Sequence, residues 1–144
     1  ADFDKEIKFL ENKDCKNFFE ENAKTKKEIQ LQYPDKENVK NSLLTYALGR
    51  EAVAQKDCSG HVEKSLKLRL EGISLLESIK RPDLNILQQL ATSYQLVGYD
   101  YNLLGNINNG IKFLERGLKI DEENSKIIKL IFLFFEILLY KNPI

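Results

Sequence analysis

The sequence predicts an all-α protein, on the evidence of its composition and of two features of its apolar pattern. The 144 residues include only 7 Gly and 3 Pro, too few for the many tight turns of an all-β domain. Apolar residues recur three and four positions apart along nearly the whole chain, and no convincing run alternates with period two. We therefore expect five to seven antiparallel helices joined by short loops, with no sheet.

Two helices are expected near the N-terminus. Apolar residues at helical spacing between Phe3 and Leu10 predict the first, and those between Cys15 and Ala23 predict the second. The stretch from Asn22 to Glu28 is very polar, so we expect the second helix to be exposed or frayed there. Pro34 disfavours a helical residue before it and marks the boundary of the next element.

The rest of the chain predicts five further helices. The first four of them are separated by a turn at Asp57–Gly60, by Pro82 and by Gly105-Asn106. Ser125 is a plausible N-cap for the last, which would run to about Tyr140. The expected ranges are Glu37 to Lys56, His61 to Lys80, Leu84 to Leu104, Asn108 to Ile120 and Ser125 to Tyr140.

Composition excludes several classes of function. With 42% hydrophobic and 31% charged residues, the chain is typical of one globular domain that needs no metal or disulfide support. Basic and acidic residues balance at 22 each, so we expect no nucleic-acid partner. The last apolar segment is too short for a membrane span. The chain begins at Ala1 without a signal-like segment, which we interpret as a processed chain or a fragment, and the compartment stays unknown, with cytoplasm and bacterial cell envelope both open.

A search for reactive chemistry leaves one small candidate. Cys58 and His61 share a short turn, which is compatible with a thiol–imidazole pair or with two metal ligands. A closed zinc site needs four ligands, and only distant Cys15 and common carboxylates are left to complete it. We favour a loop histidine and a half-buried cysteine, and therefore no catalytic, cofactor or metal site. The two cysteines do not fix a redox compartment.

The segment from Gln89 to Asn124 carries the one specific pattern in the chain. Large and small residues alternate there in a fixed order: Tyr94, Val97-Gly98, Tyr101, Gly105, Gly110, Leu114, Gly117, and then Leu118 and Ile120. This order resembles a tetratricopeptide repeat (TPR) over the full length of the repeat. The segment departs from the family at Glu122, where a proline is usual.

The glycines support a close crossing of two helices without reference to the family. Gly98, Gly110 and Gly117 all fall inside predicted helices, where each costs about 1 kcal/mol relative to Ala. Close packing of Tyr94 and Tyr101 against the facing helix is the expected compensation. We predict that Gly110 and Gly117 lie against that helix.

Neighbouring segments match the family less well. Leu44 to Lys80 is similar to a degenerate repeat whose second helix is lengthened, with Ser65 and Gly72 at the small positions. Ser125 to Tyr140 looks like the first helix of a third repeat. We expect residues 1–33 to form an N-terminal helical segment packed with a TPR-like domain at 34–144.

The resemblance implies a non-enzymatic module or adaptor that binds another protein, as a peptide or a helix, in a concave groove. The family's groove-facing positions fall on Tyr46, Arg50, Thr92, Gln95, Tyr99, Asn102, Lys126 and Lys129. The Lys and Asn residues with which some members clamp a terminal carboxylate do not match here, so aromatic and amide contacts are expected instead.

The last predicted helix suggests an alternative function, a structural subunit that oligomerises. Ile127 to Tyr140 is apolar except at Lys129 and Glu136, and a helix apolar all round is expected to be buried all round. In the third-repeat alignment Ile128, Ile131, Phe132 and Phe135 face the preceding hairpin, and Phe134, Ile137 and Leu138 form an open flank. We expect this flank to contact either the N-terminal helices or a second chain, which includes a second copy of the protein. A third possibility is that more of the protein once followed residue 144.

Overall fold

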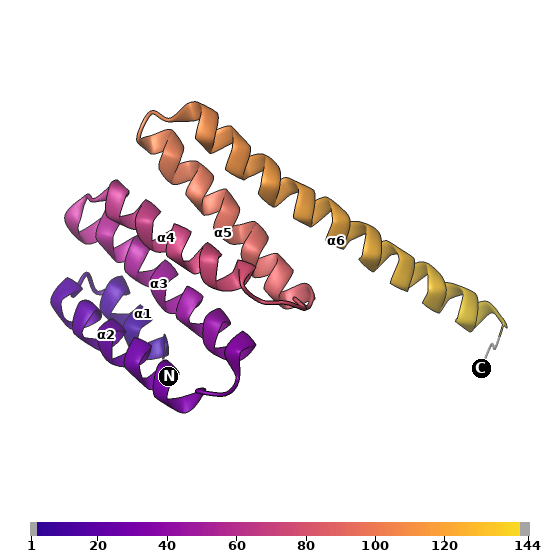
Figure 1. The fold of residues 1–144 in the computed structure, drawn as a ribbon, viewed down its shortest axis with the longest axis horizontal. Coiled ribbons are helices and arrows are strands. Elements are labelled where there is room, and N and C mark those ends of the chain that lie inside the picture. The colour runs from indigo at the N-terminus through magenta and orange to yellow at the C-terminus, as the bar shows by residue number, and fades with distance from the viewer. Residues whose placement is uncertain (1–2, 142–144) are drawn as a thin grey trace.

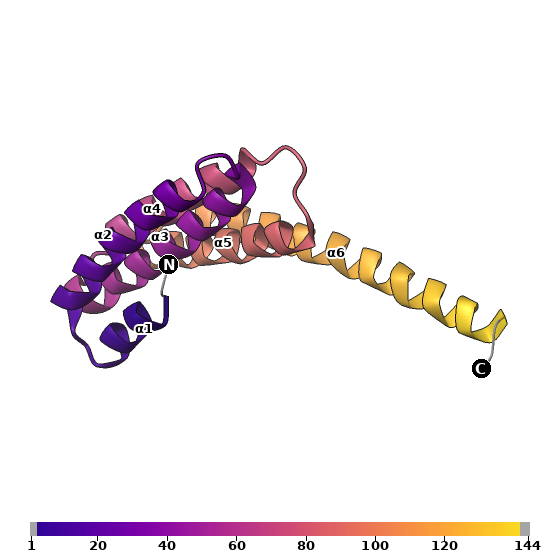
Figure 2. The ribbon, with the colours of Figure 1, turned by 90° about the horizontal axis from the view of Figure 1, so that it is seen from below.

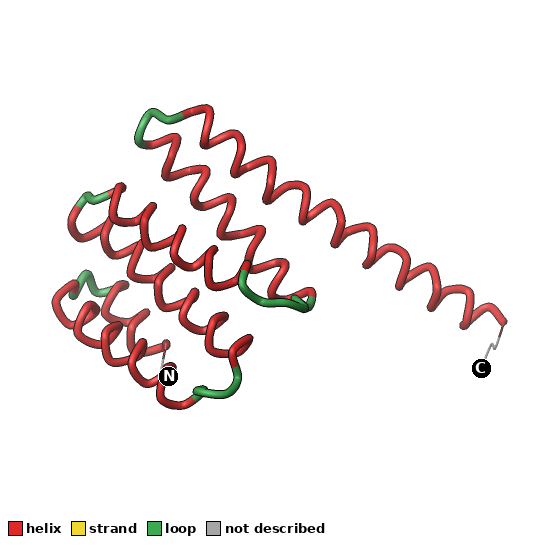
Figure 3. Tube along the Cα trace, viewed as in Figure 1, coloured by secondary structure: helices red, strands yellow, loops and turns green. Residues whose placement is uncertain are grey.

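The structure, a computed structural model, describes residues 3–141, with side chains described to residue 138. Within this range it consists of six α-helices and contains no strand (Figures 1 and 3), so the predicted all-α fold is confirmed. The helices are α1 (Phe3–Glu11), α2 (Cys15–Gln32), α3 (Glu37–Ser59), α4 (Val62–Glu77), α5 (Leu84–Leu103) and α6 (Ile107–Lys141).

The helices form a linear array in which each one packs mainly against the helices before and after it in sequence. The most extensive contacts lie within two hairpins, α3–α4 and α5–α6. The α1–α2 pair lies at one end of the array and α6 at the other (Figures 1 and 2). Because every connection reverses the chain, α3 and α5 run in the same direction on either side of α4.

A side-chain cap and two glycines in the left-handed conformation set several of the helix ends. The Asp83 side chain accepts a hydrogen bond from the backbone N–H of Ile86 at 2.9 Å, which starts α5 directly after Pro82. Gly60 ends α3 in the left-handed conformation, with φ of 67°, so α3 runs three residues past the predicted end at Lys56. Gly105, with φ of 80°, turns the chain between α5 and α6 as the sequence indicates.

The α5–α6 crossing is as close as the glycines predict. A Cβ atom at Gly98 would lie 2.9 Å from the carbonyl oxygen of Gly110, and one at Gly117 would lie 2.8 Å from that of Ala91. A Cβ atom at Gly110 would overlap the side-chain amide of Asn102. The expectation that Gly110 and Gly117 lie against the facing helix is therefore confirmed.

Aromatic packing accompanies this crossing. The rings of Tyr94 and Tyr101 lie 5.9 and 5.5 Å from the ring of Phe113, centroid to centroid. Val97 and Ile73 complete the buried cluster, with Leu114 half-buried and within reach of Gly98. Buried Gly72 repeats the close approach in the α3–α4 hairpin, where a Cβ atom would lie 2.9 Å from the Thr45 side chain.

The prediction of a separate last helix is wrong. The helix that begins at Ile107 does not stop at Ile120 but continues without a break to Lys141. Ser125 lies inside it and caps nothing, because no Gly or Pro follows Gly117 until Pro143 and nothing interrupts the backbone ladder. The side of α6 that should face the preceding hairpin at Ile128, Ile131, Phe132 and Phe135 is exposed instead, since α5 does not extend that far.

The N-terminal helices also differ from expectation. Asn22 and Thr25 are buried, because this polar part of α2 packs on α3, where the Asn22 amide donates a hydrogen bond to the carbonyl of Ala47 at 3.0 Å. The α1–α2 pair lies far from the end of α6 (Figure 1), so the alternative in which it covers Phe134, Ile137 and Leu138 is excluded.

Cys15, the first residue of α2, forms a disulfide with Cys58 in the last turn of α3. The bond closes a segment of 43 residues across a Cα–Cα distance of 6.1 Å. This pairing excludes the thiol–imidazole and metal interpretations of Cys58 with His61. Sequence alone did not indicate the bond, because a 43-residue separation says nothing about spatial proximity.

Candidate functional site

A groove of about 760 Å³ lies between α3 and α5, with α4 as its floor. Its size is in the range of ligand-binding clefts. The residues that line it are Thr45, Tyr46, Gly49, Arg50 and Val53 of α3, Leu68, Arg69 and Gly72 of α4, and Asn85, Gln88, Gln89, Thr92, Ser93 and Leu96 of α5.

Polar contacts between α3 and α5 bound the groove at both ends. At one end the Ser42 hydroxyl donates to the Gln89 side-chain oxygen at 2.8 Å, and the Gln89 amide donates to the Ser42 carbonyl at 3.0 Å. At the other end the Lys56 ammonium group contacts the Asp100 carboxylate at 2.8 Å. The two helices are thus held at a fixed separation while the middle stays open.

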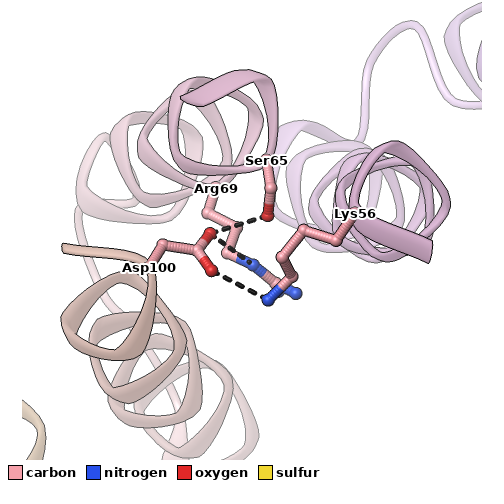
Figure 4. Close-up of polar contacts among 4 residues, drawn as sticks. All are labelled: Lys56, Ser65, Arg69 and Asp100. Atoms are coloured by element: carbon pink, nitrogen blue, oxygen red, sulfur yellow. Dashed lines mark hydrogen bonds and ion pairs between the residues drawn. The ribbon is translucent and has the colours of Figure 1, made fainter. Parts of the chain in front are cut away.

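Asp100 is fully buried and joins three helices (Figure 4). One carboxylate oxygen accepts a hydrogen bond from Lys56 of α3. The other accepts one from the Ser65 hydroxyl of α4 at 2.6 Å and lies 3.4 Å from Nε of Arg69. Because a buried carboxylate is costly unless it is paired and hydrogen-bonded, this arrangement makes its burial tolerable.

The Asp100 cluster carries more positive than negative charge. One carboxylate faces an ammonium and a guanidinium group, and the Arg69 side chain is only 5% exposed. Burial lowers the pKa of Arg69, although the Asp100 carboxylate opposes the shift. Nε of Arg69 makes no hydrogen bond to any residue that the structure describes. The groove floor therefore contains a buried guanidinium group that is held by the Asp100 carboxylate behind it.

Arg50 forms the second ion pair beneath the groove. Its Nε lies 3.8 Å from a carboxylate oxygen of Glu6, which is fully buried in α1, and its guanidinium carbon lies 4.9 Å from the centre of the Phe3 ring. Burial raises the pKa of the Glu6 carboxyl, and Thr25, Arg50 and Asn22 lower it in part. Neither the Glu6 oxygens nor Arg50 Nε makes a hydrogen bond within residues 3–138.

The lining of the groove thus has a distinct electrostatic character. It includes two arginines and several side-chain amides and hydroxyls, and no carboxylate from residues 3–138. The two carboxylates that pair with the arginines lie behind them, in the core. A negatively charged group entering the groove would meet guanidinium donors without facing a like charge.

Only part of the predicted groove set lies here. Tyr46, Arg50 and Thr92 line the groove. Gln95 instead donates a hydrogen bond to Asp121 of α6 at 3.0 Å, and Asn102 packs over Gly110 at the α5–α6 crossing. Tyr99 is exposed and does not line the groove. Lys126 and Lys129 lie on α6, beside a shallow depression that also involves Asp121, Glu122 and Ser125.

Sequence reasoning missed Arg69 and Asp100, the two ends of the buried pair. Arg69 follows Leu66 by three positions and precedes Ile73 by four, so it falls within the apolar stripe of α4. Asp100 likewise follows buried Val97 by three positions. The sequence did contain a signal: a basic residue and an acidic residue each stand inside an apolar stripe. Charged residues at such positions are buried only when they pair with each other, so the two could have been matched.

The exposed part of α6 is a second candidate surface. From Ile127 to Leu138 its ten large apolar side chains are all between 40 and 65% exposed. The set includes the predicted interface residues Phe134, Ile137 and Leu138. Figures 1 and 2 show this half of α6 extending beyond the other helices.

Comparison with protein-family models, with curated proteins and with solved structures returned no significant match. Among the described residues no cluster of three or more His, Cys, Asp or Glu has the arrangement of a metal site. Within residues 3–141 no helix has the length and apolarity needed to cross a membrane.

Proposed function

We propose that this chain is a non-enzymatic, TPR-like interaction module that binds an acidic peptide segment in the groove between α3 and α5. The array of antiparallel hairpins and the small residues at the α3–α4 and α5–α6 crossings support the TPR-like assignment. The α3–α4 hairpin then corresponds to the degenerate repeat and α5–α6 to the well-matched one.

The observation that carries the proposal is the lining of the groove, which includes the arginines Arg69 and Arg50 and, among the described residues, no carboxylate. A ligand carboxylate that reaches Arg69 or Arg50 would form charge-assisted hydrogen bonds with their guanidinium groups.

Other lining residues favour a peptide. Asn85, Gln88 and Gln89 offer amide donors and acceptors that pair with a peptide backbone. Val53, Leu68 and Leu96 offer apolar contacts for its neighbouring side chains. This arrangement differs from the Lys and Asn clamp that the sequence argued against, because the charged groups are arginines and stand on α3 and α4.

The test uses short peptides with acetylated and amidated ends, one alternating Leu and Glu and the other alternating Leu and Gln, measured by fluorescence anisotropy. The Glu peptide should bind at least tenfold more tightly. A charged hydrogen bond contributes about 1.5–3 kcal/mol, so Arg50→Gln should weaken Glu-peptide binding at least tenfold and leave the Gln peptide unaffected. Arg81→Gln, an exposed arginine outside the groove, is the matched control.

Three results separate the outcomes of this test. Equal binding of the two peptides, or an Arg50→Gln variant that binds like the control, would overturn the proposal. A Leu–Gln peptide with a free C-terminus that binds better than the capped Glu peptide would show that the groove takes a terminal carboxylate instead. Circular dichroism of each variant checks that the array stays folded.

The second candidate function is a structural subunit that assembles through α6. The exposed apolar half of that helix favours it, because monomeric proteins rarely expose contiguous apolar patches of more than a few hundred Å². Light scattering on the full chain tests it: the candidate requires a mass above the 16.7 kDa of one chain that persists on dilution through the micromolar range. A monomer at those concentrations would exclude it.

A further inference from the structure

The exposed half of α6 begins where α5 ends. In the α5–α6 hairpin Gly98 packs near Gly110 and Ala91 near Gly117, so each pair of facing residues has numbers that sum to 208. By the same register Leu84, the first residue of α5, faces Asn124. From Ser125 onward, the stripe of α6 that packs on α5 continues with no helix against it.

The apolar surface there is large enough for a stable interface. Five of the exposed side chains lie on the α5-facing side and its flank, and they present on the order of 500 Å² per copy, or about 1,000 Å² for two copies, which is the area that a specific interface needs. The stripe that continues the α5-facing side consists of Ile128, Ile131, Phe132 and Phe135.

The two charges between residues 127 and 138 indicate the partner and its direction. Lys129 and Glu136 are seven residues apart, so they lie on the same edge of the helix. A second copy of α6 running parallel and in register would place Lys beside Lys and Glu beside Glu. A second copy running antiparallel would place each Lys129 beside the Glu136 of the other chain, twice, about one twofold axis.

We propose that two copies of this chain associate through residues 125–141 of α6 as an antiparallel, twofold-symmetric helix pair in the Lys129–Glu136 register. The proposal rests on the second candidate function, assembly through α6, and is independent of the groove. The α6 helix of each copy packs on the part of the other α6 that α5 does not cover.

The register is consistent with the packing of the rest of the molecule. In this register, residues at the same level along the two helices have numbers that sum to about 265, so α6 ends level with Asn124 of the other copy, and the pairing ends where α5 begins. In heptad packing with Lys129 and Glu136 at the flanking e positions, Phe132 of each copy meets Phe135 of the other. Ile131 and Leu138 then meet on the opposite flank. The remaining apolar side, which includes Leu130, Phe134 and Ile137, takes no part in this pair.

The test exchanges the charges in the full chain. Wild-type protein should have a mass that is an even multiple of one chain. Lys129→Glu and Glu136→Lys should each weaken self-association at least tenfold, since each places like charges together twice. The double variant should restore it, and so should an equimolar mixture of the two single variants. Lys126→Glu, which makes the same change on the outward side of the helix, should have no effect.

Analytical ultracentrifugation and far-ultraviolet circular dichroism give the readouts. A monomeric wild type would overturn both this proposal and assembly through α6, whereas the groove test would stand. Assembly that is insensitive to the single charge reversals, or is not restored in the mixture, would overturn the antiparallel register while leaving assembly in place. A wild type that is monomeric and binds neutral phosphatidylcholine vesicles would show that a lipid surface covers the patch, and would overturn the proposal.

Discussion

Gly117 offers the sharpest test of the α5–α6 packing, because a matched glycine exists elsewhere in the array. Both Gly117 and Gly49 lie inside helices, where replacement by Ala gains about 1 kcal/mol of helix propensity. A Cβ atom at Gly117 would lie 2.8 Å from the Ala91 carbonyl oxygen and 3.1 Å from Cγ of Gln95, whereas one at Gly49 would meet nothing within 4 Å. The same substitution should therefore have opposite signs at the two sites.

The magnitude follows from the atoms that must move. The carbonyl of Ala91 belongs to the α5 backbone and cannot rotate away, so Gly117→Ala has to separate the two helices, and such overpacking costs about 1–3 kcal/mol. After the propensity gain of about 1 kcal/mol, the variant should lose up to about 2 kcal/mol of unfolding free energy. Gly49→Ala should gain up to about 1 kcal/mol. Gly117→Leu should lose more than Gly117→Ala, since it adds three carbon atoms at the same contact.

Urea denaturation followed by circular dichroism measures both variants under one condition. A chain of this size should shift its melting temperature by about 2–4 °C for each kcal/mol, so a thermal scan provides an independent check. The peptide ligand is omitted, because Gly49 lines the groove. If Gly117→Ala proves as stable as Gly49→Ala, the close crossing is wrong and the repeat assignment loses its structural basis.

Three further predictions concern the buried groups and the disulfide. Replacing Cys15 and Cys58 by Ser should lower the unfolding free energy by about 4 kcal/mol, the loop-entropy value for 43 residues, and urea denaturation that shows no loss would contradict the bond. Asp100→Asn leaves two cations without their carboxylate and should cost about 3–5 kcal/mol in the same assay, while a neutral result would mean that the pair is not buried. Burial raises the pKa of Glu6 above 4.5, so the folded wild type holds this proton more tightly than the unfolded chain and loses stability as pH rises through that pKa. Glu6→Gln should therefore be increasingly stable relative to wild type as pH rises, and a constant difference between pH 4 and pH 8 would refute the argument.

Much of the fold followed from local patterns. Periodic apolar residues and the stop signals Gly60, Pro82 and Gly105 located α3, α4, α5 and the start of α6 to within a few residues. The glycines of the α5–α6 crossing were identified because each is unfavourable in a helix unless close packing compensates for it. The polar stretch of α2 was predicted only in part: Ala23, Lys24, Lys27 and Glu28 are exposed as expected, whereas burial of Asn22 depends on a carbonyl supplied by α3, which a local pattern does not contain.

The candidate site was predictable only in part, for a related reason. Arg50 and Thr92 were found because a repeat pattern places them on a groove-facing side of their helices. Arg69 and Asp100 belong to different helices. A charged residue in an apolar stripe is unexpected by itself, and its burial is explained only by the opposite charge that the fold brings beside it. The disulfide is the same kind of feature, a pairing between residues 43 positions apart. Long-range pairs of this kind are set by the three-dimensional arrangement and leave only single, ambiguous signals in the sequence.

The helix break that was predicted at Ser125 is absent, and the reason lies in the apolar stripe of α6. The apolar stripe of α6 continues unchanged past Asn124, yet its first half is covered by α5 and its second half is exposed. The stripe indicates that a partner is required along the whole helix, and a break was expected because each hairpin of a repeat array normally supplies that partner from the same chain. The helix is unbroken and α5 does not extend past Leu84, so in the structure no helix covers this half, and the proposed second copy would cover it. Lys129 and Glu136 then become informative, because one charge of each sign at heptad spacing on a single helix is self-complementary only in an antiparallel pair.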